Sequence, residues 1–259
     1  MVTILDSIIE RKRIEAEVLK RAGIKIRYPE SHQHSLIQNL KITETMAIIS
    51  EFKRASPSKG DINLTLNPQE QAKLYENAGA AAISVLTDEE GFKGTFNDLL
   101  EVRKAVDIPV LCKDFIVDKI QIDFARAHGA NVILLIASVL PQAELFELYG
   151  YAAGHGLECL VEIHDERDLE KALAINASLI GVNNRDLKTF QVNIETTERL
   201  GPLVKEAGAL LISESGIKSK EDVLRASAAG ANGILVGETL MTSRDIQQSF
   251  MDFKVPVGG

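Results

Sequence analysis

The chain has 259 residues, 45% of them hydrophobic and 25% charged, and these proportions are typical of a globular protein, not of a fibrous or disordered one. Its 29 basic and 37 acidic residues give a net charge of −8, whereas a nucleic-acid-binding protein usually carries an excess of positive charge. No apolar run reaches the ~18 residues that a membrane span requires, so we expect neither a membrane nor a nucleic-acid partner.

Residues 1–45 are expected to form an N-terminal helical extension. From Ile4 to Lys20, apolar residues recur at helical spacing among charges of both signs, which predicts an amphipathic helix and not a signal peptide. The apolar face of this helix needs a partner, which is either the bottom or the mouth of the domain that follows. A polar connection comes next and contains His32 and His34. Because no third or fourth ligand lies nearby, this pair is interpreted as solvent-exposed and not as a metal site.

From residue 46 onward, strand-like runs alternate with segments of helical periodicity. Eight such units of roughly 26 residues predict a single (β/α)8 TIM-barrel domain over residues 46–259, within the usual size of that fold. A doubly wound sheet is disfavoured because no glycine-rich dinucleotide or P-loop motif occurs anywhere in the chain. The expected strands lie within residues 46–53, 81–88, 109–115, 131–139, 157–164, 178–185, 209–216 and 232–238.

Charged side chains follow the strand ends, where barrel active sites lie. Strand side chains alternate between two faces, and in several strands an apolar or small residue stands two positions before the polar one, so both point into the barrel. Each of these residues, taken alone, is explained as well by an ion pair at a strand end. The convergence of several charged residues at one place favours an acid–base site, in which neighbouring charges shift each other's pKa values. Without further histidines or cysteines, a lysine/glutamate site is favoured over a metal site. The residues that meet at the mouth are Glu51, Lys53, Lys113, Glu162, Asn183 and Glu214.

A second signal indicates anion binding. The loop after the first strand, residues 53–60, concentrates three positive charges and two hydroxyl groups in an acidic protein. Gly216 and Gly237 end the seventh and eighth strands, the common phosphate position in barrels, although glycine is also ordinary turn chemistry there. Together these features predict a small phosphorylated substrate.

The two cysteines, Cys112 and Cys159, lie inside apolar strand-like runs. They are interpreted as buried thiols of a protein in a reducing compartment, which predicts a cytoplasmic location. Association with another enzyme has no signature in the sequence.

Six segments, in this order, resemble the indole-3-glycerol-phosphate synthase family: residues 50–60 (SEFKRASPSKG), 112–118, 160–173, 181–190 (GVNNRDLKTF), 213–217 and 235–241. The similarity covers nearly the whole chain. It implies a ring closure of 1-(2-carboxyphenylamino)-1-deoxy-D-ribulose 5-phosphate that releases CO2 and water and needs no cofactor. It also places the N-terminal extension across the catalytic mouth.

The resemblance further implies roles for individual residues. The general acid falls on Lys113, the carboxylate that assists dehydration on Glu162, and a second proton donor and substrate anchor on Lys53. The supporting polar residues are Glu51, Asn183 and Glu214. The implied substrate-binding residues are Ser56, Gly216 and Gly237 for phosphate, Arg185 and Ser215 beside them, and Phe92, Phe115, Leu134, Ile136 and Leu187 for the anthranilate ring. Leu134 and Ile136 are explained as well by ordinary barrel packing.

Two other functions compete with this interpretation. One is a sugar-phosphate isomerase or epimerase on the same scaffold, similar to phosphoribosylanthranilate isomerase, which uses a different acid–base pair. The other is a catalytically silent barrel that binds a phosphorylated metabolite. A pure binder requires the anion pocket but not the lysines and carboxylates, so the enzyme is favoured over both.

Overall fold

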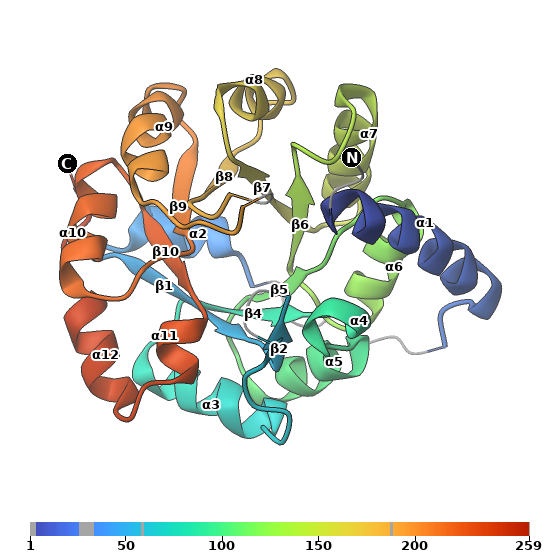
Figure 1. Cartoon of the computed structure of the whole chain (residues 1–259), viewed down its shortest axis with the longest axis horizontal. Coiled ribbons are helices and arrows are strands. Elements are labelled where there is room, and N and C mark those ends of the chain that lie inside the picture. Colours follow the sequence, from blue (N-terminus) through green and yellow to red (C-terminus); the bar gives the residue numbers. More distant parts are fainter. Residues whose placement is uncertain (1–3, 26–33, 58–59, 187–188, 259) are drawn as a thin grey trace.

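Eight parallel strands close into a barrel in the computed structural model, which describes residues 4–25, 34–57, 60–186 and 189–258. The closed order is β1-β10-β9-β8-β7-β6-β5-β4, as Figure 1 shows from a view in which the helices ring the strands. Each predicted run contains one barrel strand, so the predicted fold is confirmed. The strands are β1 (Ala47–Phe52), β4 (Ala82–Leu86), β5 (Val110–Lys113), β6 (Val132–Ile136), β7 (Glu158–Ile163), β8 (Leu179–Asn183), β9 (Leu210–Glu214) and β10 (Gly233–Val236).

Alternate residues of each strand face two different cores. Ile49, Leu111 and Ile212 belong to the core inside the barrel. Phe52 and Cys112, which have the opposite parity, pack in the larger core between strands and helices. The side-chain alternation therefore aims the polar residues at the strand ends into the barrel mouth, as the sequence predicted.

Several of the outer helices begin at polar residues that cap them. Thr95, Asp118 and Ser219 each form a capping box, in which the cap side chain and the third helical residue satisfy each other's backbone N–H groups. The long outer helices are α3 (Pro68–Ala78), α5 (Phe96–Ala105), α6 (Lys119–Ala127), α7 (Gln142–Gly154), α8 (Glu166–Ala174), α9 (Glu195–Glu206), α10 (Lys220–Ala228) and α12 (Ile246–Phe253), and the short ones are α4 (Glu89–Phe92) and α11 (Glu238–Met241). No helix in these described ranges has the length and apolar character needed to cross a bilayer.

In the described part of residues 1–45, two helices precede the barrel. The amphipathic α1 (Ile4–Ala22) matches its prediction and packs beside α6 (Figure 1). The second, α2 (Leu36–Ile42), was not predicted, because its segment was interpreted as part of a polar connection. Leu36 and Leu40 are buried in the core inside the barrel, and Glu158 at the start of β7 accepts hydrogen bonds from the first backbone N–H groups of α2. This second helix therefore closes the bottom of the barrel.

The loop after β1 contains a small hairpin that the sequence did not predict. Its strands are β2 (Ala55–Ser56) and β3 (Gly60–Asp61). Arg54 lies against the ring of Phe52, and its Nη1 is 2.7 Å from Asp98 of α5. One of the three charges predicted for anion binding is therefore used to attach this loop to the barrel wall.

His34, of the pair interpreted as solvent-exposed, is only partly exposed, and its Nε2 lies 3.3 Å from Oδ1 of Asp107. His34 therefore lies against the loop before β5, which the pattern of polar residues did not indicate. His32 lies outside the described residues.

Candidate active site

A cavity of about 620 Å³ opens at the carboxyl ends of the barrel strands. Leu5 and Ile8 of α1 contribute to its wall, so α1 lies at the mouth while α2 closes the bottom. The predicted site residues that line this cavity are Glu51, Lys53, Ser56, Phe92, Lys113, Phe115, Leu134, Ile136, Glu162, Asn183, Arg185, Ser215, Gly216 and Gly237. Glu214 is fully buried beneath the cavity, and Leu187 lies outside the described residues.

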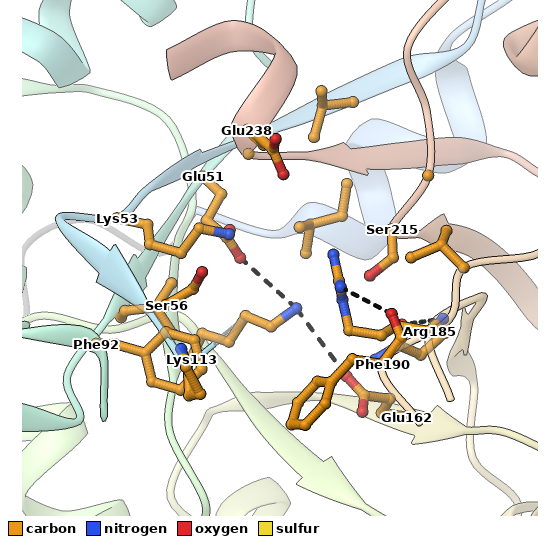
Figure 2. A pocket seen from close by; sticks show the side chains of 18 of the residues that line it. Glu51, Lys53, Ser56, Phe92, Lys113, Glu162, Arg185, Phe190, Ser215 and Glu238 are labelled. Carbon is orange, nitrogen blue, oxygen red and sulfur yellow. Dashed lines mark hydrogen bonds and ion pairs between the residues drawn. The ribbon is translucent and has the colours of Figure 1, made fainter. Parts of the chain in front are cut away.

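Lys113 at the end of β5 is surrounded by carboxylates from other strands. Its Nζ lies 2.6 Å from Oε2 of Glu214, 3.8 Å from Oε2 of Glu51 and 4.0 Å from Oε2 of Glu162. Figure 2 shows this ammonium group in the cavity between Glu51 and Glu162. Burial by itself lowers the pKa of an amine, but the three carboxylates outweigh it and raise the pKa of Lys113 well above its ordinary value. The lysine is therefore charged over the whole physiological pH range.

The carboxylates differ in their surroundings. Burial raises the pKa of Glu214 to about 7, because the neighbouring Lys113 offsets burial only in part and Glu162 adds repulsion. Burial also acts to raise the pKa of Glu51, but Lys53, Lys113 and Arg185 outweigh it and hold this pKa below its ordinary value. Carboxyl groups with opposite shifts at one site are typical of acid–base catalysis.

Lys53 lies just beyond the end of β1, with its Nζ 2.5 Å from Oε1 of Glu51. The barrel mouth thus holds two separate ammonium groups, each bound to its own carboxylate. With Arg185, three cationic side chains face Glu51, Glu162 and Glu214, so the site is near charge balance before a substrate arrives. An anionic substrate can then replace a carboxylate as the partner of Lys53.

Asn183 and Arg185 are fixed by the loop after β8. Oδ1 of Asn183 accepts a hydrogen bond of 3.0 Å from the backbone N–H of Arg185, and Nη1 of Arg185 donates to the carbonyl oxygen of Phe190 at 3.3 Å. Phe190 lies beside Arg185 and Glu162 in Figure 2. The loop therefore presents a guanidinium group and an aromatic ring to the same part of the cavity.

The predicted ring slot forms one wall of the cavity. The rings of Phe92 and Phe115 are 6.3 Å apart and inclined by 41°. Leu134 and Ile136 are almost completely buried in the inner core, yet both reach the cavity. For these two residues, packing and cavity lining are therefore not alternatives, because the same side chains do both.

Comparisons with known proteins show the family of the chain. The family model for indole-3-glycerol phosphate synthase matches residues 5–253. Indole-3-glycerol phosphate synthase of Bacillus cereus is 52% identical over 258 residues, which cover 99% of this chain and the whole relative, and that of Bacillus mycoides is 51% identical with the same coverage. The chain belongs to the indole-3-glycerol phosphate synthase family.

One solved structure has a similar fold at low sequence identity. Thiamine phosphate pyrophosphorylase from Pyrococcus furiosus superposes with a TM-score of 0.60 over 85% of this chain and 96% of its own, at 16% identity. That similarity concerns the barrel alone.

Several residues that line the synthase cavity were missed by sequence reasoning. Leu5 and Ile8 belong to the apolar face of α1, whose partner the periodicity could not identify. Phe190 ends the 181–190 motif and is the aromatic residue of that loop, which was a usable signal. The other missed residues of the lining are Leu86, Leu235 and Val236 of the strands, Glu238 and Thr239 of α11, and Pro57, Ile62, Asp114, Val192, Ile217, Lys218 and Thr242 outside the barrel strands and helices.

Proposed function

We propose that Lys113 is the general acid of the ring closure and that Glu162 and Lys53 serve the later loss of water. As a member of its family, the chain is a carboxy-lyase of tryptophan biosynthesis. It converts 1-(2-carboxyphenylamino)-1-deoxy-D-ribulose 5-phosphate to indole-3-glycerol phosphate, CO2 and water. The observation that carries the residue roles is the position of the Lys113 ammonium group between three carboxylates in the cavity.

Attack of the aryl carbon on the ribulose ketone develops negative charge on the carbonyl oxygen. A positioned ammonium group stabilises that charge and donates a proton as it forms. The raised pKa of Lys113 keeps its proton in place until then, and the developing alkoxide is far more basic than an amine. Release of CO2 restores the aromatic ring, so this step requires no electron-accepting cofactor.

Dehydration then requires a proton for the departing hydroxyl group and a base for the proton that is lost. Glu162 lies on the far side of Lys113 from Lys53, so the two can act on opposite sides of the new ring (Figure 2). We assign Glu162 to assist this step and Lys53 to donate a proton and anchor the substrate. Glu51, Asn183 and Glu214 support these groups by the contacts described above.

The remaining predicted residues provide binding. We assign the phosphate to Ser56 and the backbone at Gly216 and Gly237, with Arg185 and Ser215 beside it. The anthranilate ring is assigned to the slot of Phe92, Phe115, Leu134, Ile136 and Leu187. We assign residues 1–45 to an N-terminal extension, of which α1 covers this mouth and α2 closes the bottom of the barrel, and residues 46–259 to the catalytic domain. A rigid pocket of this kind lowers the barrier by orienting the flexible ribulose chain over the ring.

The test is turnover of the substrate by the wild-type chain and by Lys113→Ala. The chain contains no tryptophan, so the indole product is detected by its fluorescence on a nearly dark background. Lys113→Ala is expected to lower kcat by at least ~10²-fold, since general acids are typically worth 10²–10⁴. Lys119→Ala, which removes a lysine that is 42% exposed on α6, is the control and should keep wild-type kcat.

A Lys113→Ala enzyme with more than half of the wild-type kcat would remove Lys113 from the mechanism. Consumption of substrate by the wild type without indole fluorescence would point to an isomerase. Binding without turnover would point to a silent barrel.

A further inference from the structure

His164 lies behind the active site, one residue past the end of β7. Its Nε2 is 3.3 Å from Oε1 of Glu162, and its Nδ1 is 3.4 Å from Oδ2 of Asp168 on α8. The side chain is 15% exposed and does not line the cavity. The imidazole ring therefore touches a proposed site residue without touching the space that the substrate occupies.

The two oxygens of Glu162 have different neighbours. Oε2 faces the ammonium group of Lys113 at 4.0 Å, and Oε1 faces the imidazole of His164. The Glu162 side chain is 3% exposed, so little water reaches it. Its orientation in the cavity thus depends on the cationic groups on its two sides.

Asp168 holds the other end of the imidazole ring. Its Oδ2 also accepts a 3.0 Å hydrogen bond from the backbone N–H of His164, and its own N–H donates to Oδ1 of Asp165 at 2.9 Å. Asp168 is itself buried. The chain of contacts from α8 to the cavity therefore runs from Asp168 through His164 to Glu162.

The charges around His164 favour its imidazolium form. Burial lowers the pKa of the imidazole, but Asp168 from α8, Glu162 from β7 and Glu214 from β9 outweigh burial and raise this pKa above its ordinary value. The nearby ammonium group of Lys171 on α8 is bound to the carbonyl oxygens of Ala137 and Leu140. The contacts of 3.3 and 3.4 Å are ion pairs without hydrogen-bond geometry. Only the imidazolium form carries the charge that both pairs require, because the neutral ring has a single N–H and no charge.

We propose that His164 is a positioning residue, which as an imidazolium ion paired with both Asp168 and Glu162 directs Oε2 of Glu162 toward Lys113 and the substrate. The inference rests on the proposed role of Glu162. It assigns to His164 an effect on the chemical step and not on substrate binding. A merely structural role, such as support of the start of α8, depends on the backbone N–H of His164, which every substitution except proline preserves.

Two amide substitutions separate these roles. Gln at position 164 places its NH2 group near the position of Nε2, toward Glu162, whereas Asn places it near Nδ1, toward Asp168. We expect His164→Asn to lower kcat by about tenfold, the lower end of what a partner that orients a site residue is worth. Its KM should change less than twofold and its Tm should match that of His164→Gln. His164→Gln should recover most of the lost kcat.

The pH profile provides an independent readout. The imidazolium form is present below the pKa of His164, so wild-type kcat should fall as pH rises through that pKa, above the ordinary 6.5. An amide does not titrate, so this fall should be absent from His164→Gln. A fall that persists unchanged in His164→Gln would belong to another group, Glu214 being the nearest, and would overturn the assignment.

The pKa of His164 can be measured directly by NMR titration of its ring proton, identified by its loss in His164→Gln. Glu162→Gln should lower this pKa, because the substitution removes one of the carboxylates that raise it. An unchanged pKa in Glu162→Gln, or equal kcat in His164→Asn and His164→Gln, would overturn the inference. A Glu162→Gln enzyme with wild-type kcat would instead overturn the proposed role of Glu162, so the two failures are distinguishable.

Discussion

The ammonium group of Lys12 lies 2.7 Å from Oδ1 of Asp114, the residue that follows Lys113 in the chain. The same ammonium group is 2.9 Å from Oδ1 of Asp88 in the loop after β4. Only 3% of the Lys12 side chain is exposed, and the side chain of Asp88 is fully buried. Helix α1 is thus attached to two loops of the catalytic mouth by a buried ion-pair cluster.

Replacement of Lys12 by methionine should loosen this attachment. Methionine keeps most of the apolar stem but leaves two buried carboxylates short of a partner, a loss that typically costs about 3–5 kcal/mol. Arg13→Met is the matched control, because Arg13 pairs with Glu144 at 3.4 Å on the surface and such pairs are worth ~0–1 kcal/mol. Urea unfolding measures the free energy of unfolding of each variant. Equal losses of unfolding free energy in the two variants would show that the buried Lys12 pairs stabilise the protein no more than a surface ion pair does.

Gly181 on β8 is a glycine because Glu214 occupies the adjacent space. A Cβ atom at position 181 would overlap Oε1 of Glu214 and lie 3.3 Å from Leu160 Cδ1. Gly181→Ala should therefore displace Glu214 from Lys113, lowering kcat and costing about 1–3 kcal/mol of stability, as overpacked cores do. Gly150→Ala on α7 is the control, since no heavy atom lies within 4 Å of its Cβ position.

Gly150→Ala should leave activity unchanged and stabilise the helix by up to ~1 kcal/mol. Activity and urea unfolding measure both effects. Wild-type kcat in Gly181→Ala would mean that the position of Glu214 does not matter for turnover.

The barrel and most of its site could be predicted because they follow from local pattern. Strand alternation aimed Glu51 and Lys113 inward, and both lie in the cavity. The position of Lys12 could not be predicted in this way, since a lysine on an amphipathic helix ordinarily faces solvent. Its burial depends on Asp88 and Asp114, which lie next to it only in the folded barrel.

Helix α2 escaped prediction for a different reason. Seven residues make two turns, which is too short for periodicity to separate a helix from a loop. Leu36 and Leu40 are buried because they fill the open bottom of the barrel. That opening is formed by the closed sheet and cannot be recognised from the segment itself. Likewise, nothing in the sequence singled out His164, whose partner Asp168 lies four residues further along the chain.

The proposed phosphate site predicts that inorganic phosphate inhibits competitively and raises the Tm, because a ligand of the folded state stabilises it by mass action. Ser56→Asp should weaken both effects, since it places a negative charge beside the anion. Thr65→Asp adds the same charge at an exposed position outside the cavity and serves as the control. Unchanged inhibition in Ser56→Asp would place the phosphate elsewhere.

The two N-terminal helices predict opposite effects of deletion. Removal of residues 1–25 takes away α1 and the part of the cavity wall formed by Leu5 and Ile8, but keeps α2 beneath the barrel. We expect a higher KM and a lower kcat, because α1 helps to cover the site, and a fall in Tm that reflects the lost Lys12 ion pairs but is smaller than the fall for the longer truncation. Removal of residues 1–45 also uncovers the inner core at Leu36 and Leu40, and should cause a large loss of stability.

Tm and kinetics of the two truncated chains, measured side by side, test these separate roles of α1 and α2. Near-normal kinetics without residues 1–25 would show that α1 does not serve the reaction, whereas equal Tm values for both chains would show that α2 does not seal the barrel.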